Sequence, residues 1–352
     1  MWLLACCVSA PTGAADVAVA AAAYTWRLPP GFPTPAVPAE NPMSDAKVEL
    51  GRRLFYETRL SINGRYACAS CHRRELAYTD GRAHAVGTTG QRVKRSAMSL
   101  TNVAYNAAFT WGDSRLRSLE AQMHQPLFNQ HPVEMGLRRG GAAAVAALAG
   151  LTDYREQFAA AFPGDPAPVS MAHIIAAIAA FERTLISGRS PFDRYVFDDD
   201  HAALSDSAKR GMALFYSARA GCARCHSGIN FAGPIVYAGH EHVAPLFADT
   251  GLDAPADRGL MQASHRAADA GKFRVPTLRN VALTAPYMHD GRFATLEAVL
   301  DHYLRRGHGE SQNAPRPPLR LSEAEQADLI AFLGALTDPS FVDLRHTGGG
   351  LP

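Results

Sequence analysis

The sequence predicts a mainly α-helical protein built from a duplicated unit, and three observations support this prediction. Apolar side chains recur every three or four residues over 44–58 and 170–186, as on one face of an α-helix. No comparable run alternates apolar and polar residues, so we expect no substantial β-sheet. The block Gly-Arg-Arg-Leu-Phe-Tyr at 51–56 returns as Gly-Met-Ala-Leu-Phe-Tyr at 211–216. We therefore expect two similar domains.

The expected elements follow the chain in order. Residues 27–42 are rich in proline and predict an extended lead-in. Ser44 can cap the first helix, which we expect to run to about Thr58. The helix over 170–186 is apolar on most of its surface, so we expect it to lie between the two halves. The segment 322–325, Ser-Glu-Ala-Glu, is a capping box that begins a terminal helix.

Composition places the chain among globular proteins. At 352 residues it is long enough for two domains, each with its own core. Hydrophobic residues make up 47% of the chain and charged residues 19%, whereas a disordered chain would be poorer in hydrophobic residues. The formal net charge is only +2 and no dense basic cluster occurs, so we expect no nucleic-acid partner. No run of about 18 apolar residues occurs, so we expect no membrane span.

Residues 1–26 predict an export leader. A short apolar stretch, 2–10, is followed by small residues such as Ala18-Val19-Ala20 that a signal peptidase could cut. The usual positive charge before the apolar stretch is missing, since the first basic residue is Arg27. Leu3-Leu4-Ala5-Cys6 also resembles a lipoprotein box, so lipid anchoring at Cys6 stays open beside release as a soluble protein. In either case we expect a periplasmic location.

Four of the six cysteines form two copies of the pattern Cys-x-x-Cys-His, at 68–72 and 222–226. A helical turn brings the two thiols of this pattern to one face, where they can reach the two vinyl groups of one haem. The histidine that follows is close enough to bind the haem iron. Zinc is the weaker alternative, because a zinc site would need a second pair of Cys or His ligands nearby.

The two motifs therefore predict two covalently bound c-type haems, haem 1 and haem 2, each in a cytochrome c-like domain. Haem 1 would lie in a domain spanning 27–190, and haem 2 in a domain spanning 191–345. The attachment and iron-binding residues would be Cys68, Cys71 and His72 for haem 1 and Cys222, Cys225 and His226 for haem 2.

Two neighbouring segments resemble a known family. Residues 273–280, Phe-Arg-Val-Pro-Thr-Leu-Arg-Asn, and 285–291, Ala-Pro-Tyr-Met-His-Asp-Gly, are similar to the signature of bacterial di-haem cytochrome c peroxidases. The resemblance extends over roughly 42–338. Within that superfamily the chain resembles the MauG branch, and the segments 118–122 and 131–136 resemble the MbnH group, whose partner MbnP is a small secreted copper-binding protein. The resemblance implies an oxidoreductase that uses hydrogen peroxide.

The resemblance also implies which side chain completes the coordination of haem 2. In the peroxidases the sixth ligand is a methionine fourteen residues after the signature histidine, and counted from His289 that position is Tyr303. MauG-type proteins also have a tyrosine here, and a phenolate favours the higher oxidation states of iron. By helical spacing alone, Tyr303 would be a core residue of a helix over 296–304. Met288 is the other candidate ligand.

For haem 1 the resemblance implies an open distal side. Resting peroxidases close it with a histidine, whose place is taken here by Thr88, and we expect nearby His84 to be a solvated loop residue. Glu134 matches the distal glutamate of the family, and Gln122 matches its companion amide. A carboxylate there would take a proton from peroxide and return it to the leaving oxygen. Without the resemblance, Glu134 would be interpreted as a surface carboxylate.

Two further features are implied between the haems. Trp111 matches a tryptophan that lies between the haems of the family and is suited to hole transfer, although ordinary packing would also explain an aromatic residue. Compared with the family, this chain has one additional residue between Trp111 and Gln122. The family also holds a calcium ion on main-chain oxygens that match Thr284 and Pro286 and on an asparagine, whose place is taken by Ser96.

These features together predict a peroxide-dependent oxidoreductase that reaches a high-valent di-haem state. We expect it to oxidise a tryptophan, to kynurenine, on an MbnP-like secreted copper-binding protein. One alternative is a plain peroxidase that takes electrons from a small cytochrome or cupredoxin. The alternative of another class is an electron carrier without catalysis, in which both irons would be six-coordinate.

Overall fold

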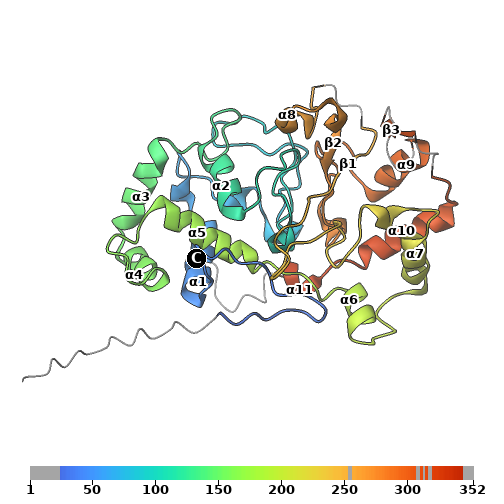
Figure 1. The fold of residues 1–352 in the computed structure, drawn as a ribbon, viewed down its shortest axis with the longest axis horizontal. Coiled ribbons are helices and arrows are strands. Elements are labelled where there is room, and N and C mark those ends of the chain that lie inside the picture. Colours follow the sequence, from blue (N-terminus) through green and yellow to red (C-terminus); the bar gives the residue numbers. More distant parts are fainter. Residues whose placement is uncertain (1–23, 253–255, 307–309, 312–313, 316–318, 344–352) are drawn as a thin grey trace, which may run out of the picture.

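The chain folds into two lobes that are joined by long loops (Figure 1). The computed structural model describes residues 24–252, 256–306, 310–311, 314–315 and 319–343. The predicted leader is therefore outside the described residues except for its last three positions, and Cys6 is outside them as well. Among the described residues, none of the helices combines the length and hydropathy needed to cross a membrane.

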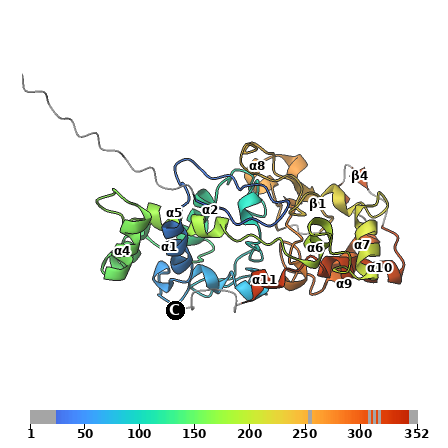
Figure 2. The same ribbon diagram turned by 90° about the horizontal axis from the view of Figure 1, so that it is seen from below.

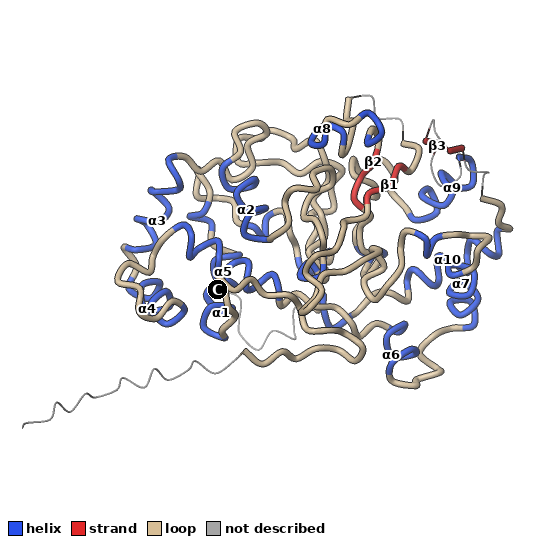
Figure 3. Tube along the Cα trace, in the orientation of Figure 1, coloured by secondary structure: helices blue, strands red, loops and turns tan. Residues whose placement is uncertain are grey.

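Helices carry most of the regular structure, as Figures 2 and 3 show, so the mainly α-helical prediction is confirmed. The first lobe contains α1 Asp45–Phe55, α2 Leu119–Phe128, α3 Ala142–Ala149, α4 Thr152–Ala161 and α5 Met171–Arg183. The second contains α6 Pro191–Phe197, α7 Asp206–Tyr216, α8 Met261–Ser264, α9 Leu296–Arg306 and α10 Glu323–Gly334. The last helix, α11 Pro339–Val342, follows the second lobe.

Short elements fill parts of the loops. The 3-10 helices are η1 Thr58–Leu60, η2 Cys68–Ser70, η3 Arg74–Leu76, η4 Val103–Tyr105, η5 Arg139–Gly141, η6 Cys222–Arg224, η7 Ala267–Asp269 and η8 Val281–Leu283. Strand β1 Phe247–Asp249 pairs antiparallel with β2 Lys272–Arg274, with Ala248 opposite Phe273. Strand β3 Glu310–Ser311 pairs antiparallel with β4 Ala314–Pro315.

Helix α1 begins where the sequence predicts. The hydroxyl of Ser44 accepts a hydrogen bond from the backbone N–H of Lys47 at 3.2 Å, which satisfies one of the free donors of the first turn. The helix ends at Phe55, before the predicted end at Thr58. The chain leaves the α-helix there because the carboxylate of Glu57 accepts a hydrogen bond from the N–H two residues later, at 2.8 Å, and so begins η1.

The other two predicted helices are also present, but one lies elsewhere than expected. Helix α10 begins at the predicted capping box, in which the Glu325 carboxylate accepts from the N–H of Ser322 at 2.9 Å. Helix α5 is capped by Ser170 and ends at Arg183. The prediction that it lies between the halves is wrong. It packs against α1 inside the first lobe, where the apolar residues on most of its surface form the centre of that core.

The predicted duplication is visible in how the helices pack. In the first lobe α1 crosses α5 at Gly51, where an added Cβ would overlap the carbonyl oxygen of Ala177. In the second lobe α7 crosses α10 at Gly211, where an added Cβ would overlap the carbonyl oxygen of Asp328. The two glycines occupy the same place in the repeated sequence block. Each is required because only a residue without a side chain lets the two helix backbones come this close.

A second repeat, which periodicity alone does not reveal, joins the lobes. Asn102 and Asn280 both adopt a left-handed backbone conformation, at φ of 55° and 60°, and each precedes a 3-10 turn. Their side chains meet at Ser187, in the connection between the lobes. Asn102 donates to the Ser187 carbonyl at 2.9 Å, and Asn280 donates to the Ser187 hydroxyl at 3.0 Å. The same buried residue thus holds corresponding loops of both lobes.

We predict that Gly211→Ala destabilises the protein by about 1–3 kcal/mol, because the new methyl group forces α7 away from α10. The direction of the change in stability is informative, because Gly→Ala inside a helix otherwise stabilises a protein by about 1 kcal/mol. Chemical denaturation would measure the free energy of unfolding. The control is Gly334→Ala on α10, where an added Cβ meets no atom within 4 Å. Equal stabilisation by both substitutions would contradict the close helix crossing.

Candidate functional site

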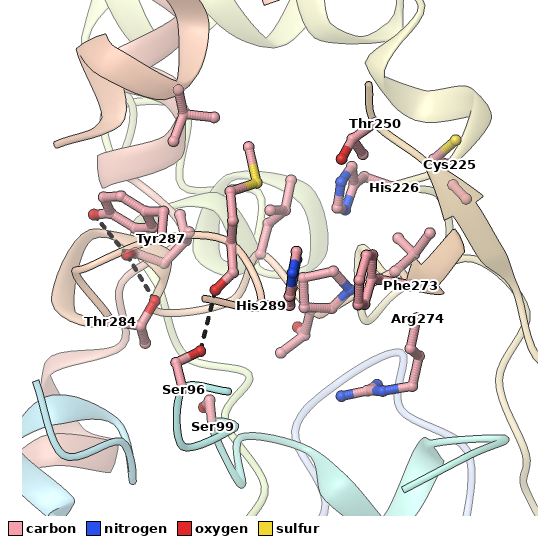
Figure 4. Close-up of a pocket in the computed structure, with 18 of the residues that line it drawn as sticks. Ser96, Ser99, Cys225, His226, Thr250, Phe273, Arg274, Thr284, Tyr287 and His289 are labelled. Carbon is pink, nitrogen blue, oxygen red and sulfur yellow. Dashed lines mark hydrogen bonds between the residues drawn. The ribbon is translucent and has the colours of Figure 1, made fainter. Parts of the chain in front are cut away.

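The second Cys-x-x-Cys-His motif forms a tight turn at one end of a cavity. The backbone N–H groups of Cys225 and His226 both donate to the carbonyl of Cys222, at 3.2 and 2.9 Å, so the motif takes the predicted helical turn. All three side chains line a cavity of about 550 Å³. Figure 4 shows Cys225 and His226 at one end of this cavity.

The ring of His226 is held in one orientation by a main-chain carbonyl. Its Nδ1 lies 2.9 Å from the carbonyl oxygen of Phe231, which occupies a left-handed conformation at φ of 49°. A histidine whose Nδ1–H is donated to a carbonyl is fixed as the tautomer with Nε2 free to bind a metal. The arrangement therefore suits His226 to be an iron ligand.

The first motif repeats this geometry. The N–H groups of Cys71 and His72 donate to the carbonyl of Cys68, at 3.1 and 3.0 Å. His72 Nδ1 lies 2.8 Å from the carbonyl oxygen of Tyr78, whose φ is 61°. None of the four motif cysteines forms a disulfide. Both turns thus offer two reduced thiols and an oriented imidazole, the set that covalent haem attachment requires.

Tyr303 lies in the wall of the same cavity as His226. It comes from α9, and burial raises the pKa of its hydroxyl, with the nearby thiols of Cys222 and Cys225 raising it further. Burial also raises the pKa of the Cys222 thiol to about 11. Most of the remaining wall is apolar, including Leu246, Val275, Leu278, Leu300, Leu319 and Leu333. An apolar slot that offers a histidine nitrogen and a tyrosine oxygen fits a haem.

Glu134 lies close to the first motif. Burial raises the pKa of the Cys71 thiol to about 12, and the charges of Asp80 and Glu134 contribute to that rise. Glu134 is itself buried enough that desolvation raises the pKa of its carboxyl. Its carbonyl accepts a hydrogen bond from the N–H of Thr88 at 2.8 Å, so the structure brings Thr88 and Glu134 side by side. The adjacent Gly87 permits this, because an added Cβ would overlap the carbonyl of Val133.

The segment that carries Glu134 is tied to the helix that carries Gln122. The N–H of Met135 donates to the carbonyl of Pro126 at 2.9 Å, and the N–H of Leu137 donates to that of Leu127 at 2.8 Å. Both acceptors belong to α2, on which Gln122 is half-buried. Gln122 and Glu134 are therefore on neighbouring, hydrogen-bonded segments.

Trp111 lies at the junction of the lobes. Its indole Nε1 donates to the carbonyl of Ser96 at 3.0 Å, and its own carbonyl accepts from the N–H of Arg274 at 2.9 Å. The N–H of Ser96 in turn donates to the carbonyl of His289 at 2.8 Å. Trp111 thus belongs to the first lobe in sequence, but its main chain is hydrogen-bonded to the second lobe.

His84 is half-buried, with Nδ1 3.1 Å from the carbonyl oxygen of Val93, so its side chain is less exposed to solvent than the sequence predicts.

The three residues expected to surround calcium all line this cavity. These are Ser96, Thr284 and Pro286. The Ser96 hydroxyl donates to the carbonyl of Met288 at 3.1 Å, as drawn in Figure 4. Within the described residues no three His, Cys, Asp or Glu side chains gather to form a metal site. A cation here would therefore depend on carbonyl and water oxygens, which Ca²⁺ accepts.

Comparison with known proteins identifies the family. A family model described as di-haem cytochrome c peroxidase matches residues 45–201. The methylamine utilization protein MauG of Methylorubrum extorquens is 38% identical over 96% of this chain and 92% of its own. The cytochrome c551 peroxidase of Pseudomonas aeruginosa is 34% identical over 84% of this chain and 80% of its own. The chain belongs to the di-haem cytochrome c peroxidase and MauG family.

A solved structure resembles this family member over nearly its whole length. It is the crystal structure of a MauG-like protein associated with microbial copper homeostasis, with a TM-score of 0.86 and 41% identity over 92% of this chain and 98% of that one. The predicted family and enzyme class are thereby confirmed: the chain is an oxidoreductase. The family implies two c-type haems.

Sequence reasoning misses the buried ion pair that supports the haem 2 motif. The guanidinium of Arg279 donates to both carboxylate oxygens of Asp193, at 2.8 and 2.9 Å, and to the carbonyl of Ile229 at 2.5 Å. It also lies over the ring of Phe231, whose carbonyl orients His226. Arg279 is part of the signature segment, but nothing in the sequence indicates that Asp193, far away in the chain, is its partner.

We predict that Asp193→Asn lowers the free energy of unfolding by about 3–5 kcal/mol, the usual effect of leaving one buried charge without its partner. Thermal and chemical denaturation of the holoprotein would measure the change. The control is Asp206→Asn at the exposed start of α7, where we expect a loss of at most about 1 kcal/mol. Similar losses for the two variants would mean that the Arg279 pair does not support the lobe.

Proposed function

We propose that this enzyme uses hydrogen peroxide to oxidise a tryptophan, to kynurenine, on an MbnP-like secreted copper-binding protein. The observation that carries the proposal is the placement of Tyr303 in the cavity of His226, which supports a second iron closed by a histidine and a tyrosine. The likeness to a MauG-like protein associated with microbial copper homeostasis supports the choice of partner. The location we propose is periplasmic.

The residues divide into two attachment sites. We assign haem 1 to Cys68, Cys71 and His72, because Glu134 lies near this turn: its charge helps to raise the pKa of the Cys71 thiol. We assign haem 2 to the corresponding set in the second lobe, Cys222, Cys225 and His226, with Tyr303 as the sixth ligand. When bound, the haems would supply the redox chemistry by which peroxide gains two electrons and two protons and becomes water.

Glu134 is the proposed acid and base for peroxide. A general base works best when its pKa lies near the working pH, and burial moves the pKa of Glu134 upward in that direction. Its carboxylate would accept the proton of the bound peroxide and then donate it to the leaving oxygen. Gln122 would orient the peroxide from the neighbouring helix α2.

The protein substrate would react at a distance from peroxide. With Tyr303 on one face and His226 on the other, haem 2 would have no position for a substrate. Electrons from a docked partner would then pass through the protein, and Trp111 at the junction is the proposed relay between the two sites. Each N-formylkynurenine would need two peroxide molecules, which accept four electrons and four protons and become four water molecules. The tryptophan would give up those four electrons and four protons and take two oxygen atoms from water, and hydrolysis would then release formate and leave kynurenine.

A plain peroxidase is the second candidate, since the similar P. aeruginosa protein is named a cytochrome c551 peroxidase. As a plain peroxidase, the present enzyme would take its electrons from a small cytochrome or cupredoxin. The candidate of another class, an electron carrier, would not react with peroxide, and the half-buried Glu134 beside the first motif argues against it. We also propose a calcium ion beside Thr284, Pro286 and Ser96.

Tyr303→Phe should remove one of the ligands of haem 2 while leaving the haem covalently attached. We predict that the second low-spin ferric signal disappears from the electron paramagnetic resonance spectrum. Tyr287→Phe is the control, since Tyr287 lines the same cavity and donates to the carbonyl of Val281 at 3.1 Å. An unchanged spectrum of Tyr303→Phe would limit this tyrosine to packing.

Glu134→Gln should keep both haems and react with peroxide about 10²- to 10⁴-fold more slowly, the usual contribution of a general acid and base. Stopped-flow absorbance of the ferric protein would follow the reaction. Glu156→Gln, on the exposed side of α4, should react at the wild-type rate. A loss smaller than about threefold for Glu134→Gln would exclude the proposed proton transfer.

The partner reaction can be tested by mixing holoenzyme, peroxide and a purified MbnP-like protein, followed by peptide mapping. We predict oxygenation or kynurenine formation at one tryptophan, because an oxidising equivalent leaves by a fixed route. If the partner's tryptophans stay intact while reduced cytochrome c or cupredoxin is consumed rapidly, the plain peroxidase replaces this function.

A further inference from the structure

Within the described part of the chain, one buried cation of the haem 2 cavity has no carboxylate beside it. The described part of the chain buries three arginines, Arg183, Arg274 and Arg279. Arg183 is paired with Glu120 at 2.8 Å, and Arg279 is paired with Asp193. Arg274, on β2, is only 8% exposed, and its Nε has no hydrogen-bond partner. Its Nη2 has only the sulfur of Met98, at 3.8 Å.

No carboxylate of the described protein compensates this charge. Burial lowers the pKa of Arg274 to about 10, and no acidic group acts on it in the opposite direction. An unpaired charge in an apolar interior is costly, so such groups are normally paired. Arg274 is paired in the folded protein only if a bound group supplies the anion.

A second polar side chain in the same cavity also has unmet hydrogen-bonding capacity. His289 is buried, and neither of its ring nitrogens has a hydrogen-bond partner. Its ring is stacked on Phe273, with centroids 3.6 Å apart, so its orientation is fixed. Asp257 approaches Nε2 only to 4.0 Å. Arg274 and His289 thus both line one cavity and both have unused hydrogen-bonding atoms.

The place of these groups in the cavity indicates which anion they meet. In Figure 4, Cys225 and His226 are at one end, and Arg274 is on the side away from them, as are Ser96 and Ser99, with the stacked rings of Phe273 and His289 between. A c-type haem is attached to its cysteines along the vinyl edge, and its two propionate carboxylates extend from the opposite edge. A haem held at the motif would therefore direct its carboxylates toward Arg274.

We propose that Arg274 is the counter-ion of a propionate carboxylate of haem 2, with His289 as a second hydrogen-bond donor to that edge. The proposal rests on the assignment of haem 2 to this cavity. Arg274 is bound through its main chain to Trp111, so the carboxylate site is part of the junction between the lobes. A positive charge fixed at this edge favours the reduced form of the iron.

The test uses holoprotein carrying Arg274→Gln or Arg274→Lys. In Arg274→Gln we expect the propionate bending mode of haem 2 to shift in resonance Raman spectra. We also expect the ratio of reduced to oxidised haem 2 at a fixed potential to fall about tenfold, the order of effect of one partly buried charge. Arg274→Lys keeps the charge and should recover most of this ratio. Arg266→Gln removes an exposed charge from the same lobe and should change neither quantity.

The mass of the denatured protein distinguishes failure of the counter-ion proposal from failure of the haem 2 assignment, because it shows whether a haem is attached. If haem is attached at Cys222 and Cys225 but Arg274→Gln matches Arg266→Gln in both spectrum and potential, the counter-ion proposal is overturned and the assignment of haem 2 stands. If no haem is attached there, the assignment fails first. If Arg274→Gln folds poorly, Arg274→Lys provides the test. We expect its propionate bending mode to shift, because lysine lacks the planar guanidinium that would bind the carboxylate; an unshifted mode would overturn the proposal.

Discussion

The hydrogen bond between a histidine Nδ1 and a main-chain carbonyl is the interaction around which each lobe is built. At His226 the acceptor is Phe231, and at His72 it is Tyr78; both acceptor residues are held at positive φ. That backbone conformation is unfavourable for a residue with a large side chain, so the surroundings must maintain it. In the second lobe Arg279 does so, since it binds the neighbouring carbonyl of Ile229 and covers the ring of Phe231. The direction of Nε2, and with it the position of any iron, follows from these contacts.

The two similar lobes differ in the residues that lie near the motif histidine. The helix pairs cross at equivalent glycines, and both motifs make the same turn. Tyr303 lies in the cavity of His226, whereas the residues near the first motif are a half-buried carboxylate, Glu134, and a threonine, Thr88. A duplicated fold can therefore hold one site that admits a small reactant and another that is closed by the protein.

How far the sequence predicts this structure depends on how local each signal is. The helical turns of the motifs and the caps at Ser44 and Ser322 are set by neighbouring residues, and they form as predicted. The place of α5 depends on which helix it meets, and periodicity shows only that most of its surface is apolar. The pairing of Arg279 with Asp193 and the isolation of Arg274 are properties of the folded cavity. Both arginines are in the recognisable signature, but a motif does not show which charges find partners.

Both motifs should hold a haem through the same set of residues. Peptide mapping of the denatured holoprotein by mass spectrometry can test this, because thioether bonds survive denaturation. We expect one haem on the peptide containing Cys68 and Cys71 and one on the peptide containing Cys222 and Cys225, with no free thiol in either. A peptide from either motif that carries two unmodified thiols in protein matured by an intact haem-attachment system would contradict it.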